Sequence, residues 1–227
     1  PGYISAIATG ASLTGTNMLV QVLLIPLYVH YLSESKFGFL MILLSICNFA
    51  AIGVGWLSGG LVRQLGECWA HSDKPGFNDV FFVGKFTFTA YATLVSIVGV
   101  SLWFLFQGVS TTTSNSGIAV LLAGAYLICT YELLPERQAF IGTNKQSPGN
   151  QIEFIRILLF AGLTWIFLPK YPEVSTVIIM MLASVIFQRI LLAFYWRHEV
   201  GLFGWGKFSS SMIPVLKRLT GKQGLGY

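Results

Sequence analysis

Long stretches without a charged residue alternate with short polar segments along this chain. The first stretch runs from residue 1 to Ser33 and contains no Lys, Arg, Asp or Glu. As a helix rising 1.5 Å per residue, residues 4–32 exceed the ~30 Å hydrocarbon core of a bilayer. This pattern predicts a membrane-spanning helix.

Polar side chains recur at helical spacing within this first expected span. One helical face holds Gly10, Thr14, Asn17 and Gln21. Side-chain amides at membrane depth are costly unless they are paired. Two interpretations stay open: Asn17 and Gln21 join this helix to its neighbours, or they line a watery path. Pro26 removes a backbone hydrogen bond and predicts a kink.

Five more apolar segments follow, separated by polar or turn-rich sequence. The charge-free run between Lys85 and Glu132 is too long for one helix and divides at the Ser/Thr-rich residues 107–117. Pro135 ends or kinks the next helix before a hydrophilic loop. A turn-rich loop is expected over residues 63–79. The six expected spans are residues 4–32, 37–62, 80–106, 118–134, 151–168 and 174–196.

Glycines gather near the end of the second expected span. Gly55 and Gly59 have the GxxxG spacing that lets a neighbouring backbone approach closely. The same glycines also loosen a helix for a bend. We favour close packing.

The composition places the chain outside the soluble globular class. Its mean hydropathy is +0.69 and only 10% of its residues are charged, whereas soluble domains have about 25%. The net charge of +5 therefore indicates no nucleic-acid partner, because in a membrane protein the placement of the charges matters more than their sum. Three cysteines without CxxC spacing are expected to be reduced, and three scattered histidines form no metal-binding pattern.

The basic residues indicate how the chain is oriented. Twelve Lys or Arg residues lie near the ends of the expected spans that face the same side as the N-terminus. Only Lys36 and Lys170 lie near the opposite ends of the spans. The excess of Lys and Arg predicts which side is cytoplasmic. Both termini are therefore expected in the cytoplasm. Residues 1–196 form the membrane lobe, and residues 197–227 are a basic connector expected at the cytoplasmic membrane surface.

The chain contains no phosphate-binding loop, no HExxH, no GxSxG and no pair of carboxylates within an expected span. These absences argue against an ATP-driven pump or a membrane hydrolase, so we expect no catalytic residue, cofactor or metal. The remaining chemistry lies in arginines near the inner ends of the spans, namely Arg63, Arg137, Arg156 and Arg189. Their planar guanidinium groups suit phosphate, or they reach lipid headgroups and fix the topology. Arg156 and Arg189 lie deepest in their spans.

Two short segments resemble the opening of the polysaccharide-biosynthesis flippases. Residues 32–46 (LSESKFGFLMILLSI) have the turn with an aromatic–glycine step, here Phe37–Gly38, that leads into the second span of that family. Residues 61–66 (LVRQLG) are similar to the arginine-bearing segment that closes it, with Arg63 as the match. The six-span order extends the resemblance along the chain. The family includes the O-antigen flippases, within the multidrug/oligosaccharidyl-lipid/polysaccharide exporter superfamily.

This resemblance implies a fold and a function. The family fold has two six-helix lobes around a central cavity and moves undecaprenyl-pyrophosphate-linked glycan across the bacterial cytoplasmic membrane by alternating access. Because six spans make one lobe, and because the chain starts at Pro1 and stops at Tyr227, we expect an N-terminal lobe that lacks its second lobe, or a self-associating half-transporter. Membrane lipids, a polysaccharide polymerase and glycosyltransferases are further expected partners.

The site residues follow from this hypothesis. Arg63, Arg156 and Arg189 would hold the pyrophosphate, and Asn17 and Gln21 would line the glycan path. Glu132 and Pro26 are candidates for coupling or gating. A multidrug cation antiporter of the same superfamily is the first alternative, although the carboxylates are expected in loops or at span ends, with Glu132 nearest to a span. A membrane enzyme that modifies glycans is the second, and it would need a catalytic constellation.

Overall fold

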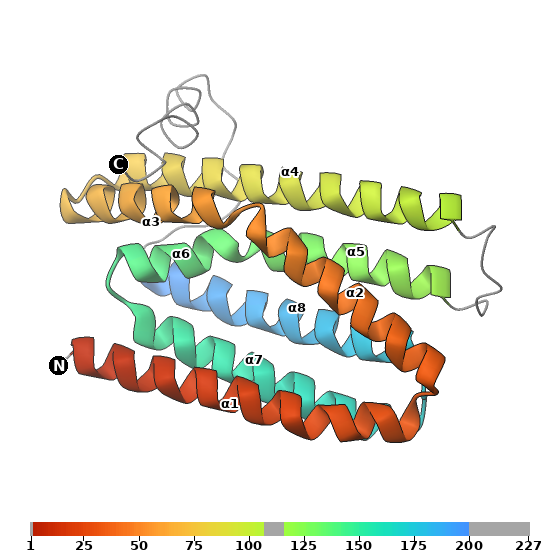
Figure 1. Ribbon diagram of the computed structural model, residues 1–227. Coiled ribbons are helices and arrows are strands. Elements are labelled where there is room, and N and C mark those ends of the chain that lie inside the picture. Colours follow the sequence, from red (N-terminus) through yellow and green to blue (C-terminus); the bar gives the residue numbers. More distant parts are fainter. Residues whose placement is uncertain (1, 107–115, 200–227) are drawn as a thin grey trace.

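The protein is built from helices that lie side by side along one long axis (Figure 1). The computed structural model describes residues 2–106 and 116–199, and the regular structure in these ranges is all helical. The helices are α1 (Gly2–Tyr31), α2 (Glu34–Ile52), α3 (Gly55–Ala70), α4 (Lys74–Phe106), α5 (Ser116–Glu132), α6 (Leu134–Gly142), α7 (Gln146–Phe167) and α8 (Val174–Glu199). The expected all-helical class is confirmed. Residues 107–115 and 200–227, which hold most of the expected Ser/Thr-rich divider and connector, lie outside the described residues.

Within the described ranges, five helical segments are long and apolar enough to cross a membrane: Ile7–Tyr31, Lys74–Leu105, Ser116–Gly142, Gln146–Phe167 and Val174–His198. Large apolar side chains cover their outer faces, since Leu19 is 65% exposed, Leu105 76% and Phe194 70%. Lipid accepts such a surface, whereas water would penalise it. The chain therefore has the build of a multi-pass membrane protein.

The second expected span is not one continuous helix. Its residues are divided between α2 and α3 by a break at Gly53–Val54, and this pass is not among the five segments above. No neighbouring atom comes within 4 Å of the Cβ position at Gly55 or Gly59. The expectation that these two glycines give close packing is therefore wrong in the described part of the chain. The backbone instead changes direction at this break (Figure 1).

A second break separates α5 from α6. Pro135 lies in the first turn of α6, and Leu133 is the residue that separates α6 from α5. Proline has no amide hydrogen to donate to the preceding helical turn and is well suited to the first turn of a helix, so it ends α5 and starts α6. The predicted effect of Pro135 is confirmed. The hydrophilic loop expected after Pro135 is wrong, because residues 134–142 form α6, where Ala139 and Phe140 are buried.

Two helices extend beyond the apolar segments that predicted them. The loop expected over residues 63–79 shrinks to the turn between α3 and α4. Ser72 in that turn has a φ of 55°, and Asp73 Oδ1 accepts a hydrogen bond of 3.0 Å from the Gly76 amide, which caps α4. The apolar pattern stops at the membrane surface, but helical structure continues in the polar sequence.

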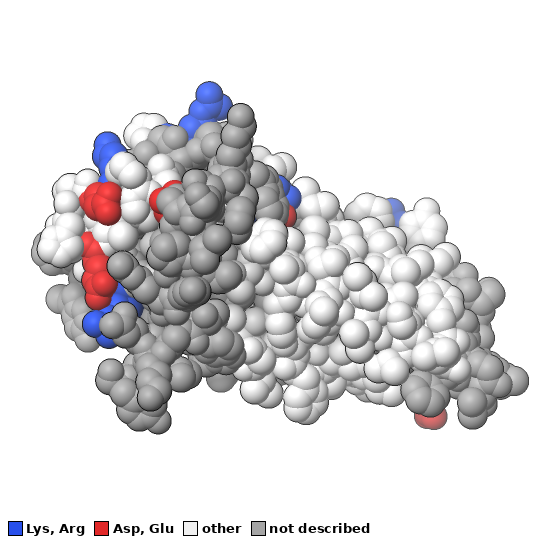
Figure 2. Space-filling model, turned by 90° about the horizontal axis from the view of Figure 1, so that it is seen from above, with Lys and Arg blue, Asp and Glu red and all other residues white. Residues whose placement is uncertain are grey.

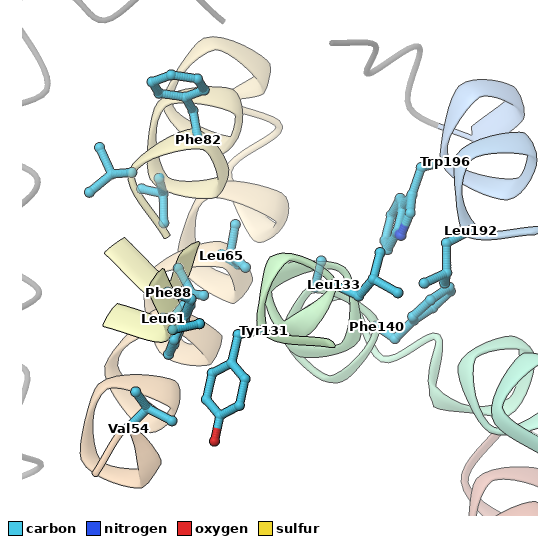
Figure 3. Packing of buried hydrophobic residues seen from close by; sticks show 14 of the residues in the cluster. Val54, Leu61, Leu65, Phe82, Phe88, Tyr131, Leu133, Phe140, Leu192 and Trp196 are labelled. Carbon is cyan, nitrogen blue, oxygen red and sulfur yellow. The ribbon is translucent and has the colours of Figure 1, made fainter. Parts of the chain in front are cut away.

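The buried side chains form two clusters that hold the helices together. One joins α3, α4, α5, α6 and α8 around Leu61, Leu65, Leu133, Phe140 and Trp196. Figure 3 shows Leu133 between the helix that holds Leu61 and the side chains of Leu192 and Trp196. The other cluster joins α1, α2, α5, α7 and α8, and includes Leu24 and Leu40. The breaks at Gly53–Val54 and Leu133 both lie beside the first cluster.

Charged residues concentrate at one end of the bundle. Figure 2 shows blue and red atoms gathered at one end, with a broad white surface beside them. At the opposite end Lys36 Nζ donates to Glu173 Oε1 at 2.7 Å and to the Pro172 carbonyl at 3.1 Å. This contact holds the α1–α2 turn against the α7–α8 turn. Lys36 thus lies at the end opposite to most charged residues, as was assumed when the basic residues were assigned to alternating ends of the expected spans.

Candidate functional site

A group of four charged side chains surrounds the break between α5 and α6. Glu132 ends α5 and Glu136 lies in the first turn of α6. Both are buried, with 6% and 7% of their surface exposed. Lys85 Nζ, from α4, donates to Glu136 Oε1 at 2.8 Å and lies 3.6 Å from Glu132 Oε1. Arg189 Nη1, from α8, donates to Glu132 Oε2 at 2.8 Å. We call these four residues the Lys85 group.

A second group of polar side chains lies directly beside the first. Arg137 Nη2, from α6, donates to Glu153 Oε2 of α7 at 2.7 Å and to Gln188 Oε1 of α8 at 3.1 Å. Gln188 Nε2 donates to the same Glu153 oxygen at 2.7 Å. Arg156 Nε donates to Glu153 Oε1 at 3.0 Å. We call these four residues the Glu153 group.

The two groups are continuous along the chain, and together we call them the charge network. Glu136 is followed by Arg137, and Gln188 by Arg189, so α6 and α8 each contribute to both groups. The network contains four cationic side chains and three carboxylates, which leaves one positive charge in excess when all are ionised. In a low-dielectric interior the removal of one partner leaves a costly unpaired charge. The network therefore joins five helices and keeps a positive charge inside the bundle.

Two cavities adjoin the network. The first, the α7 cavity, has a volume of about 330 Å³, and its lining includes Leu13, Arg137, Asn150, Glu153 and Gln188. The second, the α3 cavity, has a volume of about 270 Å³ and lies between the two helix breaks. Arg137 lines both. It is therefore the member of the charge network that the two cavities share, and Glu153 and Gln188 also face the α7 cavity.

The structure brings three of the predicted residues into the network. Glu132, Arg156 and Arg189 all belong to it, and each is paired. Arg156 is largely covered, with a 17% exposed side chain, whereas the side chain of Arg189 is 49% exposed. Arg189 is thus the more accessible of the two arginines.

The other predicted residues lie elsewhere. Arg63 is on the polar end of α3, where its Nε donates to Glu67 Oε1 at 2.9 Å and its side chain is 67% exposed. Asn17 and Gln21 are exposed on α1. Pro26 is also exposed and does not end α1, which continues to Tyr31. These four residues do not join the network.

The start of the polar face on α1 does contact α7. Asn150 Nδ2 donates to Thr9 Oγ1 at 3.2 Å, and the Cβ position at Gly10 lies 3.6 Å from the same Asn150 nitrogen. Thr14 Oγ1 donates to the Gly10 carbonyl at 3.0 Å. Helix pairing therefore accounts for this end of the polar face, and its other end, at Asn17 and Gln21, is left exposed.

Sequence reasoning singled out Arg137 only as one of four arginines near the inner ends of the spans. It missed the other four members of the network, which are Lys85, Glu136, Glu153 and Gln188. The sequence placed the carboxylates in loops or at span ends, with Glu132 nearest to a span, and Glu132 does end α5. Glu132 and Glu136 both lie in the membrane-length segment Ser116–Gly142, and their spacing of four residues was the available signal. Among the described residues no group of three His, Cys, Asp or Glu side chains could hold a metal ion, and the three cysteines are free thiols.

The chain matches no protein-family model, and a search of curated proteins found no match either.

Proposed function

We propose that this chain forms one lobe of a transporter that moves a lipid-linked oligosaccharide across the bacterial cytoplasmic membrane. The observation that supports this proposal is the charge network, which keeps an excess positive charge inside a bundle of membrane-length helices, beside two cavities. An anionic pyrophosphate headgroup suits such a site, because guanidinium groups bind phosphate with paired, charge-assisted hydrogen bonds. The sequence resemblance to the flippases points in the same direction.

Arg189 is the arginine best suited to bind the headgroup. It has a half-exposed side chain and one carboxylate partner, Glu132. Arg156 is covered and shares Glu153 with Arg137, so we assign it to holding Glu153 in place. Arg63 lies on the exposed polar end of α3 and would meet the headgroup before it enters the bundle. The basic end of the molecule faces the cytoplasm in this proposal, as the positive-inside rule predicts.

A second lobe would cover the exposed polar face of α1. Asn17 and Gln21 are exposed among the described residues, and amides facing lipid are costly. A facing lobe, or a second copy of this chain, would place them on a shared polar path. This part of the proposal rests on their exposure and on the family resemblance.

Cation antiport is the second candidate, and one observation favours it. Glu132 and Glu136 are buried within a membrane-length segment, and intramembrane carboxylates serve cation and proton transfer in many transporters. Their pairing with Lys85 and Arg189 makes them less available to a cationic substrate. We therefore rank the glycan transporter first.

The test of the proposed function measures export of surface glycan in the producing cell. Deletion of the gene should abolish surface glycan and cause its lipid-linked precursor to accumulate, without changing efflux of a lipophilic cation.

In the full-length protein Arg189→Gln should weaken headgroup binding by about ten- to a hundredfold, and Arg189→Lys should restore part of the binding. Lys170→Gln, at the opposite end, is the matched control at equal membrane abundance. Normal surface glycan after deletion would refute the proposal, and lost cation efflux would favour the antiporter.

A further inference from the structure

The α3 cavity lies where two passes of the chain are interrupted at the same level. Its lining comes from both sides of the α2–α3 break and from the end of α5 and the start of α6. The polar residues of this lining include Asn48, Ser58, Thr130, Tyr131, Arg137 and Gln138. In transporters, interrupted helices mark binding sites, because polar groups can gather there without facing lipid. The position of this cavity therefore favours a ligand site.

The lining offers hydrogen-bonding groups of mixed kind. Asn48 and Gln138 supply amides, and Ser58, Thr130 and Tyr131 supply hydroxyls. Amides and hydroxyls both donate and accept hydrogen bonds. A ligand with many hydroxyl groups matches such a lining better than a ligand that only donates or only accepts.

Two of these hydroxyls are buried without a partner. Thr130 Oγ1 and Tyr131 Oη make no hydrogen bond within the described part of the chain, and Tyr131 is only 5% exposed. Figure 3 shows the Tyr131 hydroxyl pointing away from Leu61 and Leu133, on the side of Val54, which also lines the cavity. Buried polar groups without a partner are rare in folded proteins and suggest that a ligand or water satisfies them.

The charge of the lining narrows the class of ligand. Among the described residues no carboxylate lines the cavity, and the one charged residue in the lining is Arg137. A cation would therefore find no counter-charge. The rings of Tyr126 and Tyr131 offer apolar faces, which suit a compact ligand with an apolar face and a hydroxyl-bearing edge, as a pyranose has.

We propose that the α3 cavity binds a sugar residue of the transported molecule. This inference rests on the proposed function and adds a site that is separate from the arginine that holds the headgroup. Arg137 connects the two sites, because its Nη2 binds Glu153 in the charge network and its Nε has no partner in the described residues. A sugar in the cavity would lie next to a pyrophosphate held at the network.

The test compares two lipids that differ only in the sugar. The full-length protein is placed in nanodiscs that contain the lipid-linked glycan of the producing strain, undecaprenyl pyrophosphate, or neither. A ligand that binds only the folded state raises the melting temperature, so the glycolipid should raise it more than undecaprenyl pyrophosphate does. Asn48→Ala and Gln138→Ala should weaken glycolipid binding by about tenfold, and binding of undecaprenyl pyrophosphate should not change.

Exposed amides outside the α3 cavity provide the controls. Asn78→Ala and Gln151→Ala remove exposed amides outside the cavity and should behave as wild type. Equal shifts with both lipids, or variants that keep the difference between them, would overturn the sugar site and leave headgroup binding intact. No shift with either lipid would overturn the proposed function as well.

Cys47 provides a second measurement that needs no change to the polar lining. It lines the cavity and is a free thiol. In a Cys68→Ser, Cys129→Ser background, the glycolipid should slow methanethiosulfonate labelling of Cys47 severalfold, and undecaprenyl pyrophosphate should not. Equal labelling rates with the two lipids would contradict the sugar site even if the alanine variants failed to fold.

Discussion

The two interrupted passes, α2–α3 and α5–α6, face each other across one cavity but are built differently. The α2–α3 break contains glycine, and Phe49 and Ile52 near it are 70% and 71% exposed. The α5–α6 break is set by Pro135, and Glu132 and Glu136 on either side of it are buried and paired. A break that contains glycine lets the chain turn but does not fix the angle between the two helices. A proline break surrounded by ion pairs fixes both the position of the turn and the angle between the helices. We infer that α5–α6 is the rigid wall of the cavity and that α2 is its adaptable wall.

The largest effect should follow from removing the cation at the rigid break. Lys85→Met leaves Glu136 and Glu132 without their shared partner, and an uncompensated buried charge costs about 3–5 kcal/mol. Lys36→Met is the matched control, because the Lys36–Glu173 pair is partly exposed, at 27% and 36%, and should cost at most about 1 kcal/mol. The measurement is melting temperature and membrane abundance. Equal losses in the two variants would contradict a rigid role for the network.

A smaller loss is expected where α3 and α6 touch through glycines. A Cβ at Gly142 would lie 2.7 Å from the Val62 carbonyl oxygen and 3.0 Å from the Gly66 nitrogen. These are backbone atoms, so the two helices would have to separate, and Gly142→Ala should cost about 1–3 kcal/mol. Gly59→Ala in α3, which has open space around its Cβ position, should be neutral or slightly stabilising. The same melting measurement checks both, and a stable Gly142→Ala protein would show that this contact is adaptable.

A still smaller effect is expected at the adaptable break. Tyr91 Oη donates to the Ala50 carbonyl at 3.1 Å, and a Cβ at Gly53 would collide with this hydroxyl. Because Tyr91 is a side chain that can move, Gly53→Ala should cost about 1 kcal/mol, the value of one hydrogen bond. In a Tyr91→Phe background the same substitution should cost less. A double-mutant cycle measures the coupling, and fully additive effects would separate Gly53 from Tyr91.

The smallest effect concerns Cys68, on the polar end of α3. Burial raises the pKa of its thiol, and the carboxylates of Asp73 and Glu67 raise it further. Because only the thiolate reacts with maleimide, labelling should be slower at neutral pH than for an ordinary thiol. Its rate should rise with pH and level off only above the usual thiol range. Glu67→Gln should shift the profile toward lower pH, and an unchanged profile would contradict the charge effect.

Sequence patterns predicted the apolar membrane-length helices and the break at Pro135. Runs without charge located the apolar helices, and Pro135 located the α5–α6 break, because both effects act within a few residues. The ends of α3 and α4 could not be placed in the same way. Residues 63–70 and 74–79 are polar, so apolar patterning stops there, although the helices continue to Ala70 and begin at Lys74.

The candidate site was predictable only in part, for a different reason. Arg156 and Arg189 were found because they lie deep in apolar segments. Glu136 was not found, because its partner Lys85 lies far away in sequence, and Glu153 was not found although one of its partners, Arg156, lies only three residues away. Lys85 reaches Glu136 across 51 residues, and Gln188 reaches Glu153 across 35. Such pairings depend on which helices pack together, which local patterns do not specify.

The order of the charges along the chain also bears on how the protein is made. Helices enter the membrane from the ribosome in sequence order and then associate. Lys85 and Glu132 emerge before Arg189, so the carboxylates of the Lys85 group meet one cation in α4 long before the second arrives on α8. Until α8 is synthesised, Glu132, Glu136 and Lys85 form a group with a net negative charge. When α8 enters, Arg189 brings the net charge of the Lys85 group to zero, so the pairing inside this group is complete only after α4, α5 and α6 are in place.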